Sequence, residues 1–169
     1  AYNNGLFDGT SPTTFAPNAV MSRAMLVTVL WRLAGAPAPK GVNTFSDVPG
    51  GTWYTDAVTW AAENGVVSGI GGGCFAPNSN VTREQTAVIL VNYAHSRGYD
   101  VGARADLSAF PDAGSVSGWA QDALSWANAA GLINGTVYGG RTILDPQGSA
   151  SRAQVAMILR SYAEHVVNA

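Results

Sequence analysis

Charged residues are scarce in this sequence. They make up 12% of the 169 residues, against roughly a quarter in a typical soluble domain. The nine basic residues, of which Lys40 is the only lysine, are scattered, and the formal net charge is −2. A chain without a basic stripe cannot displace counterions from a phosphate backbone or bind an anionic bilayer, so we expect neither a nucleic acid nor a membrane as partner.

Cysteine and long apolar runs are also lacking. The single cysteine, Cys74, excludes an intrachain disulfide, and there is no CxxC or HxxxH spacing for a metal site. No apolar run approaches the roughly 18 residues of a membrane span. The N-terminus has no basic region followed by an apolar stretch, so we expect any secretion signal to lie outside this sequence. We expect no metal and no cofactor.

One pattern of residues occurs twice in full, with nearly constant spacing. The first copy consists of Phe45, Asp47, Trp53, Ala57, Ala61, Gly65 and Gly69, and the second of Phe110, Asp112, Trp119, Ala123, Ala127, Gly131 and Gly135. Residues 75–85 and 144–154 continue the two copies, three residues further along in the second because its Gly139-Gly140 turn is longer. The chain is therefore predicted to contain at least two copies of one structural repeat.

A third, incomplete copy begins the chain. Residues 1–9 align sixty positions ahead of residues 61–69, and residues 15–25 keep that offset. We therefore predict one module over residues 1–169, with a partial first repeat at 1–44 and further repeats at 45–107 and 108–169. Without its opening segment the first repeat is expected to expose an apolar face, through which the chain could self-associate.

Each repeat is predicted to form two helices. Residues 53–64 carry small and aromatic residues at helical spacing, and Gly65 followed by Val66 is typical of a helix C-terminus. The second helix begins after Thr82, which can form a capping box with Gln85, as Ser151 can with Gln154. Ser22 can cap the corresponding helix, but Met25 offers no polar group, so that box is expected to be half made. The predicted fold class is all-α.

The motifs F-x-D-V-P, W-Y, G-V-V-x-G, F-x-P and T-R-E at residues 45–84 resemble the surface-layer homology (SLH) repeat of Gram-positive surface proteins. The resemblance covers nearly the whole chain. It implies a pseudo-threefold, three-pronged bundle of helix-loop-helix repeats, located outside the cell at the cell wall. It also implies a non-catalytic anchor whose grooves bind a secondary cell-wall polysaccharide, often one that carries a ketal-linked pyruvate.

The resemblance ties ligand binding to the arginine of a Thr-Arg-Ala-Glu motif, which corresponds here to Arg23, Arg83 and Arg152; the final glutamate is absent each time. A cation in the first turn of a helix is unfavourable by about 0.3–1 kcal/mol, which indicates a purpose. An arginine fork beside free helix N–H groups would suit a carboxylate. The structural alternative is an arginine paired with an acid such as Asp47 or Asp112.

Other candidate ligand-binding residues each have a structural alternative. Trp53 and Trp119 could stack on a sugar or belong to the core, whereas Trp60 and Trp126 are interpreted as core residues. Asp47 and Asp112 could accept sugar hydroxyls or bond their own backbone in a turn. Glycines could allow a ligand to approach the backbone, or could serve a positive φ angle; they are Gly9, Gly69 and Gly135.

Two other classes of function remain open from the sequence. A structural or self-assembly domain would pack its grooves against protein instead of glycan. A glycan hydrolase would need two carboxylates that meet in space, as Asp112 and Asp122 could. Acidic residues are spread singly and no Ser/His/Asp set is evident, so no catalytic residue is predicted.

Overall fold

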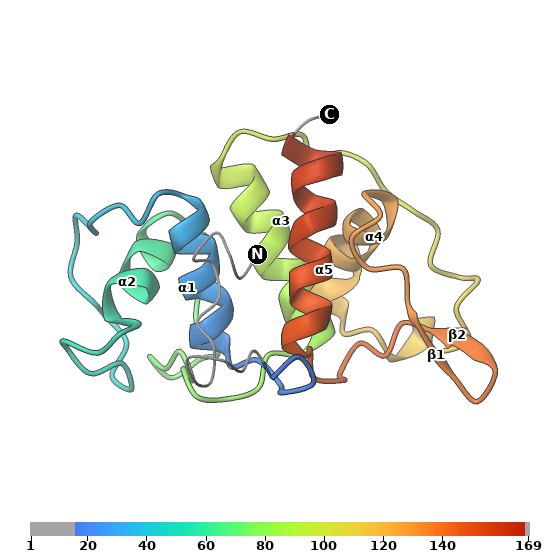
Figure 1. Cartoon of the computed structure of the whole chain (residues 1–169), viewed down its shortest axis with the longest axis horizontal. Helices are drawn as coiled ribbons and strands as arrows, with labels where there is room; N and C mark the ends of the chain where they lie inside the picture. The colour runs from blue at the N-terminus through green and yellow to red at the C-terminus, as the bar shows by residue number, and fades with distance from the viewer. Residues whose placement is uncertain (1–15, 168–169) are drawn as a thin grey trace. The chain divides into compact units, whose positions relative to one another are not determined.

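A computed structural model describes residues 16–167 of the chain (Figure 1). Its elements follow in the order α1 (Arg23–Leu33), α2 (Thr55–Glu63), α3 (Arg83–Ser96), η2 (Ala113–Ser115), η3 (Gly118–Ala120), α4 (Gln121–Ala129), β1 (Thr136–Tyr138), β2 (Arg141–Ile143), α5 (Arg152–Tyr162) and η4 (Ala163–Val167). No helix among these residues is long and apolar enough to cross a membrane.

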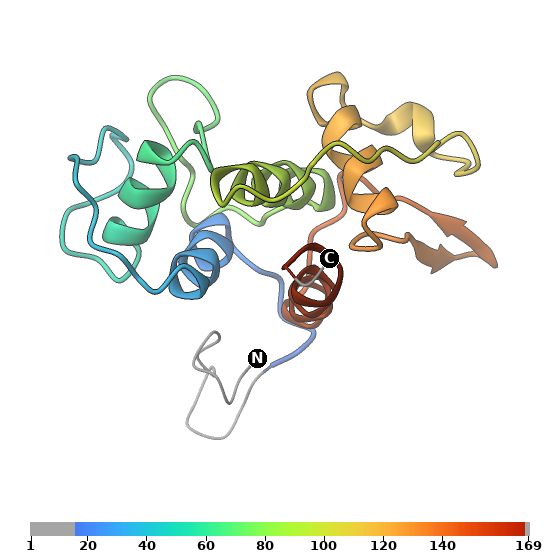
Figure 2. The same cartoon turned by 90° about the horizontal axis from the view of Figure 1, so that it is seen from above.

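The chain forms two compact units. Unit 1 comprises the residues up to Val81 together with Ser151–Ala153, and unit 2 comprises Thr82–Ala150 together with the residues from Gln154 onward. Helices α1 and α2 pack together in unit 1, and α3 packs against α4 in unit 2, as both views show (Figures 1 and 2). Each unit thus contains one helix pair with a core of its own.

The cores consist of the apolar stripes of these helices. In unit 1, Leu26 and Leu30 of α1 and Val58 of α2 are fully buried. In unit 2, Leu90 of α3 and Leu124 of α4 are equally inaccessible. The prediction that Trp60 and Trp126 are core residues is confirmed, because their exposed fractions are only 5% and 1%.

The prediction of an all-α, three-pronged bundle is wrong. Helices account for 43% of the described residues, and β1 pairs with β2 in a two-stranded antiparallel sheet. Gly139 and Gly140 have φ angles of +56° and +75°, which suit a two-residue hairpin turn. The β-branched residues that flank the turn favour strands, so the longer Gly-Gly turn seen in the sequence is part of a hairpin.

Helix ends follow the predicted capping rules with one exception. The N–H of Val66 donates to Ala61 O (2.8 Å) and that of Gly65 to Ala62 O (3.2 Å), which is a Schellman motif. The Thr82–Gln85 capping box is present. Met25 was expected to leave the box of α1 half made, but its Sδ lies 3.5 Å from the Ser22 N–H and accepts that hydrogen bond as a weak acceptor.

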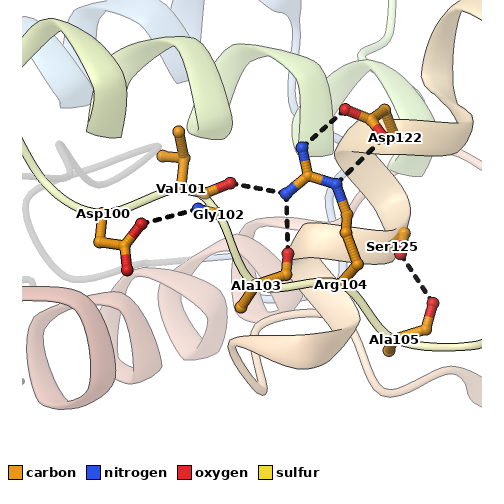
Figure 3. Close-up of polar contacts among 8 residues, drawn as sticks. All are labelled: Asp100, Val101, Gly102, Ala103, Arg104, Ala105, Asp122 and Ser125. Atoms are coloured by element: carbon orange, nitrogen blue, oxygen red, sulfur yellow. Dashed lines mark hydrogen bonds and ion pairs between the residues drawn. The ribbon is translucent and has the colours of Figure 1, made fainter.

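The connection that leads from α3 to α4 is held against α4 by side chains (Figure 3). Arg104 makes a two-point contact with Asp122, with Nη2–Oδ2 at 2.6 Å and Nε–Oδ1 at 3.0 Å. Its other Nη donates to the carbonyls of Val101 and Ala103. Ser125 Oγ donates to Ala105 O at 2.7 Å. Residues 101–105 are therefore fixed although they lie in no helix or strand.

Candidate functional site

The first N–H groups of three helices donate to backbone carbonyls of loops that contain a proline. In α1, Arg23 and Ala24 donate to Ser79 and Pro77; in α3, Arg83 and Glu84 donate to Gly148 and Pro146; and in α5, Arg152 and Ala153 donate to Ala19 and Pro17, all at 2.9–3.0 Å. The expectation of free N–H groups beside the arginines is therefore wrong. An anion at these helix starts would have to be bound by the arginine side chain itself.

The three predicted arginines are buried, with exposed fractions of 5% for Arg23, 6% for Arg83 and 4% for Arg152. The Nε of Arg23 donates to Phe75 O and the Nε of Arg83 donates to Leu144 O, both at 2.8 Å. Arg23 Cζ also lies 4.8 Å from the centroid of the Phe75 ring, a cation–π geometry. One edge of each of these two guanidinium groups is thus occupied by the protein.

The predicted aspartates bind the same two loop residues from the other side. Asp47 accepts the N–H groups of Phe75 (2.8 Å) and Ala76 (2.7 Å) with its two carboxylate oxygens. Asp112 accepts those of Leu144 and Asp145 at the same distances. The turn interpretation expected these aspartates to bond their own backbone, and the backbone N–H of Asp47 itself does help to lower the pKa of that carboxyl. The principal partners of both aspartates, however, lie in a loop 28–33 residues further along the chain.

The aspartate and arginine do not pair directly. In the part of the chain that the structure describes, neither Arg23 nor Arg83 has a carboxylate oxygen within 4.0 Å of a guanidinium nitrogen. The hydrogen bond from the Phe75 N–H is the main cause that lowers the pKa of Asp47, and the charge of Arg23 contributes less. Burial lowers the pKa of Arg83, and the charges of Asp145 and Asp112 oppose this shift.

Arg83 lines a pocket of about 180 Å³ in unit 2. One wall is the segment 131–136, which follows α4 and includes Gly135 and Thr136; the other is the face of α5 formed by Gln154, Met157, Ile158 and Ser161. We call this pocket the Arg83 groove. Its α5 residues stand at positions i, i+3, i+4 and i+7, so they form one stripe along the helix. This stripe lies outside the repeated motif, and the sequence predicted none of its residues as part of a site.

The Arg83 side chain has unused hydrogen-bonding capacity in this groove. A guanidinium group has five N–H donors, and only Nε donates to a residue between positions 16 and 167. The η nitrogens are therefore available to a ligand. The groove combines these donors with the apolar Ile158 and the exposed Met157, so it can bind a small anionic group attached to a partly apolar body.

A second pocket, of about 250 Å³, lies in unit 1 between residues 41–44 and α2. Its charged residue is Glu63, whose carboxylate accepts the backbone N–H groups of Lys40 and Gly41. Neither Arg23 nor Arg152 lines it. An acidic pocket of this kind does not suit an anionic ligand.

Glycine and tryptophan candidates lie in different settings. Gly69 and Gly135 have φ angles of +82° and +88°, and a Cβ at either would come within 2.8 Å of a backbone oxygen. Positive φ and tight packing thus account for both, and Gly135 also lines the Arg83 groove. Trp53 and Trp119 are 60% and 59% exposed and line neither pocket. Gly9 lies outside the described residues.

Sequence analysis missed Glu84, which is buried in unit 2. Its carboxylate accepts the N–H of Ser117 at 3.0 Å and the hydroxyl of Ser117 at 2.9 Å. Alanine stands at the corresponding positions, Ala24 and Ala153. A charged residue where the other two copies have alanine was a signal for a contact specific to this repeat.

The two aspartates considered for a hydrolase, Asp112 and Asp122, bind different partners in unit 2. Asp112 is engaged with the loop at Leu144, whereas Asp122 is paired with Arg104. Among residues 16–167, no three His, Cys, Asp or Glu side chains are grouped so that they could hold a metal ion. Asp112 and Asp122 thus each have a structural partner within unit 2.

Comparison with known proteins identifies a family. The family model described as "S-layer homology domain" matches residues 44–87 and 109–156. The chain is 34% identical to the surface-layer 125 kDa protein of Lysinibacillus sphaericus over 96% of its own length and 13% of that protein. It is 30% identical to an amylopullulanase of Thermoanaerobacterium thermosulfurigenes over 91% of this chain and 8% of the enzyme. An endoglucanase of a Bacillus strain is 31% identical over 94% of this chain and 16% of its own length.

The chain spans only 8% to 16% of the lengths of these relatives, which are a surface-layer protein and two enzymes. The shared segment is therefore a module that occurs in surface-layer proteins and in enzymes alike. The matches place the module at the cell surface or in the cell wall. They also support a role as a non-catalytic anchor, because the enzymes carry it over a small part of their length.

Proposed function

Since the chain belongs to the S-layer homology domain family, we propose that it anchors a surface protein by binding an acidic secondary cell-wall polysaccharide non-covalently. The ligand class is a glycan that carries a carboxylate, such as a ketal-linked pyruvate. Arg83 binds this carboxylate in the Arg83 groove. The single observation that supports this function most is the buried Arg83 guanidinium, whose η nitrogens have no partner among the described residues.

The energetic argument starts from the cost of burying a charge. The Arg83 residue as a whole is only 6% exposed, so its charge has lost much of its contact with water, and such a loss is offset only by well-placed partners. Leu144 O supplies one hydrogen bond, and Asp112 and Asp145 act from a distance. A carboxylate that accepts two N–H groups of the arginine fork would provide the missing pairing, at charge-assisted strength.

The remaining lining fits the sugar to which the carboxylate is attached. The methylene and methyl groups of Met157 and Ile158 can contact the apolar face of a sugar ring. Gln154 and Ser161 add amide and hydroxyl groups at the same wall. We propose that Arg23 and Arg152 occupy corresponding positions in a module of three repeats, at 1–44, 45–107 and 108–169.

The first test is calorimetric titration of the chain with purified wall polysaccharide, with its pyruvate intact and after mild acid removal of the pyruvate. Arg83→Gln should weaken binding of the intact polymer by about 1–3 kcal/mol, the usual range for a charge-assisted contact. The matched control is Arg97→Gln titrated with the same polymer, because Arg97 is exposed and lies outside the Arg83 groove, so its affinity should be unchanged. Equal affinity for intact and depyruvylated polymer would contradict the proposal.

The competing function is a structural or self-assembly domain whose grooves pack against protein. It would predict that Arg83→Gln changes the oligomeric mass and that removing pyruvate from the wall polymer has no effect. Light scattering over a range of concentrations measures the first, and the titration measures the second. Self-association through the first repeat belongs to this competing function, and most of the opening segment concerned lies outside the described residues.

A further inference from the structure

The β1–β2 hairpin continues one wall of the Arg83 groove. Thr136, the first residue of β1, lines the groove. Side chains alternate between the two faces of a strand, so Tyr138 lies on the same face as Thr136, about 7 Å further along. Residues that pair across two strands share a face, and Arg141 pairs with Tyr138. Tyr138 and Arg141 therefore lie on the hairpin face that begins in the groove.

Both residues are accessible to a ligand. Tyr138 is 78% exposed, which is far more than a tyrosine that contributes to a core. Arg141 is exposed as well, and it forms no salt bridge or side-chain hydrogen bond with any residue from 16 to 167. A flat aromatic ring beside a planar cation provides a stacking surface for a sugar and donors for its oxygens.

In the part of unit 1 that the structure describes, the second repeat has no equivalent of this hairpin. The corresponding loop consists mainly of glycines, Gly71 to Gly73, followed by Cys74, and is closed by a single bridge between Gly71 and Cys74. It contains neither an aromatic residue nor a cation. Any contact made by Tyr138 and Arg141 is therefore specific to the Arg83 groove, because the loop at Gly71 to Cys74 has no side chain that could make it.

We propose that Tyr138 and Arg141 form an extended subsite that binds the sugar next to the carboxylate-bearing one, so that the Arg83 groove recognises a polymer and not only its acidic unit. This inference rests on the proposed function. Tyr138 stacks on the ring of the second sugar, and Arg141 donates to its oxygens. The occupant is a continuing anionic glycan, because Arg83 supplies one cation in the groove and Arg141 supplies a second on the hairpin that continues the 131–136 wall.

The test compares two ligands with three variants of the full chain. The ligands are pyruvylated wall polysaccharide and a pyruvylated methyl hexoside, which is too short to reach the hairpin. Tyr138→Ala and Arg141→Gln should each weaken binding of the polysaccharide on the order of tenfold. Both should leave the affinity for the hexoside within about twofold. Val137→Ala is the matched control, because Val137 is 74% exposed on the opposite face of the same strand and should change neither affinity.

Several results would overturn the inference. In one outcome, Tyr138→Ala and Arg141→Gln bind the polysaccharide as tightly as the wild type, while Arg83→Gln weakens the binding of both ligands. The extended subsite would then be wrong, and the proposed function would stand. If the wild-type chain binds neither ligand, the proposed function is wrong and the subsite with it. A change in oligomeric mass of Tyr138→Ala without a change in glycan affinity would assign the hairpin to a protein contact. Circular dichroism shows that each variant is folded.

Discussion

At the scale of single residues, each unit repeats one arrangement in which a charged pair holds a loop without forming a salt bridge. In unit 1, Arg23 binds the carbonyl of Phe75 while Asp47 binds its N–H. Asp47 also binds the N–H of Ala76, whose φ angle of +57° is unusual for a residue with a side chain. The hydrogen bonds to Asp47 thus help to stabilise a strained backbone turn.

Asp47→Asn should destabilise unit 1. An amide offers only one acceptor oxygen, so one of the two N–H groups held by Asp47 loses its partner, at a cost of about 1–3 kcal/mol. Because the folded pKa of Asp47 lies below its unfolded value of 3.8, the contribution of the carboxylate is complete above that value. It is lost as the pH falls through the folded pKa. Urea unfolding followed by circular dichroism should show a difference in unfolding free energy between wild type and variant that narrows as the pH falls below 3.8. A difference that stays constant would contradict this role.

Gly69→Ala should be more damaging than the same substitution at Gly73. Both glycines have a positive φ, +82° and +73°, so alanine costs about 1–2 kcal/mol of backbone strain at either position. A Cβ at Gly69 would also lie 2.7 Å from the Cys74 carbonyl oxygen, whereas a Cβ at Gly73 has no atom within 4 Å. The difference in unfolding free energy between the two variants should be about 1–3 kcal/mol. Equal losses of unfolding free energy in the two variants would contradict this prediction, because they would mean that the loop around Gly69 shifts to accommodate the methyl group.

At the scale of elements, the sequence predicted local structure well where the signal lies within a few residues. The Schellman end at Gly65 and the Thr82–Gln85 capping box follow from residue types at fixed short spacing. The arginines at helix starts were likewise found from the repeat. The prediction of a half-made capping box at Met25 was wrong because a thioether sulfur can accept a weak hydrogen bond. The hairpin was missed because three-residue strands leave too short a pattern to stand out beside helices.

What the sequence could not provide is which distant residues meet. Asp47 was expected to bond its own turn, yet its principal partners are 28 and 29 residues away. The free helix N–H groups were expected because no sequence pattern shows that a proline-containing loop occupies them. The Arg83 groove likewise joins α3, the segment after α4, and α5. Long-range pairing depends on the tertiary fold, which local propensity does not encode.

Glu84 connects two elements of unit 2, and Glu84→Ala should destabilise this unit. The substitution leaves the Ser117 N–H without its acceptor and removes a buried carboxylate, which together cost about 1–3 kcal/mol. Ser117→Ala is the matched control, because it removes only the hydroxyl and should cost about 0.5–1.5 kcal/mol. The double variant in a urea-unfolding cycle should cost less than the sum of the two. Strict additivity would show that the hydrogen bond from the Ser117 hydroxyl to Glu84 contributes no stability.

At the scale of the whole molecule, the negative net charge and the basic groove have opposite effects on an anionic polymer. A formal net charge of −2 repels an anionic polymer at long range, so binding depends on cations placed at short distance instead of on a general attraction. Raising the salt concentration should therefore weaken a buried arginine contact only modestly, since salt screens exposed charges more than buried ones.

Because relatives as different as a surface-layer protein and an amylopullulanase share this segment, the chain should carry a foreign protein to the cell wall. A fusion of residues 1–169 to a fluorescent protein should co-sediment with purified wall fragments that retain their polysaccharide. It should stay in the supernatant with fragments from which hydrofluoric acid has removed that polymer. Arg83→Gln in the fusion should reduce the bound fraction, and Val137→Ala should not. Equal sedimentation with stripped fragments would mean that the module attaches to peptidoglycan or to protein, and the role assigned to Arg83 would then be wrong.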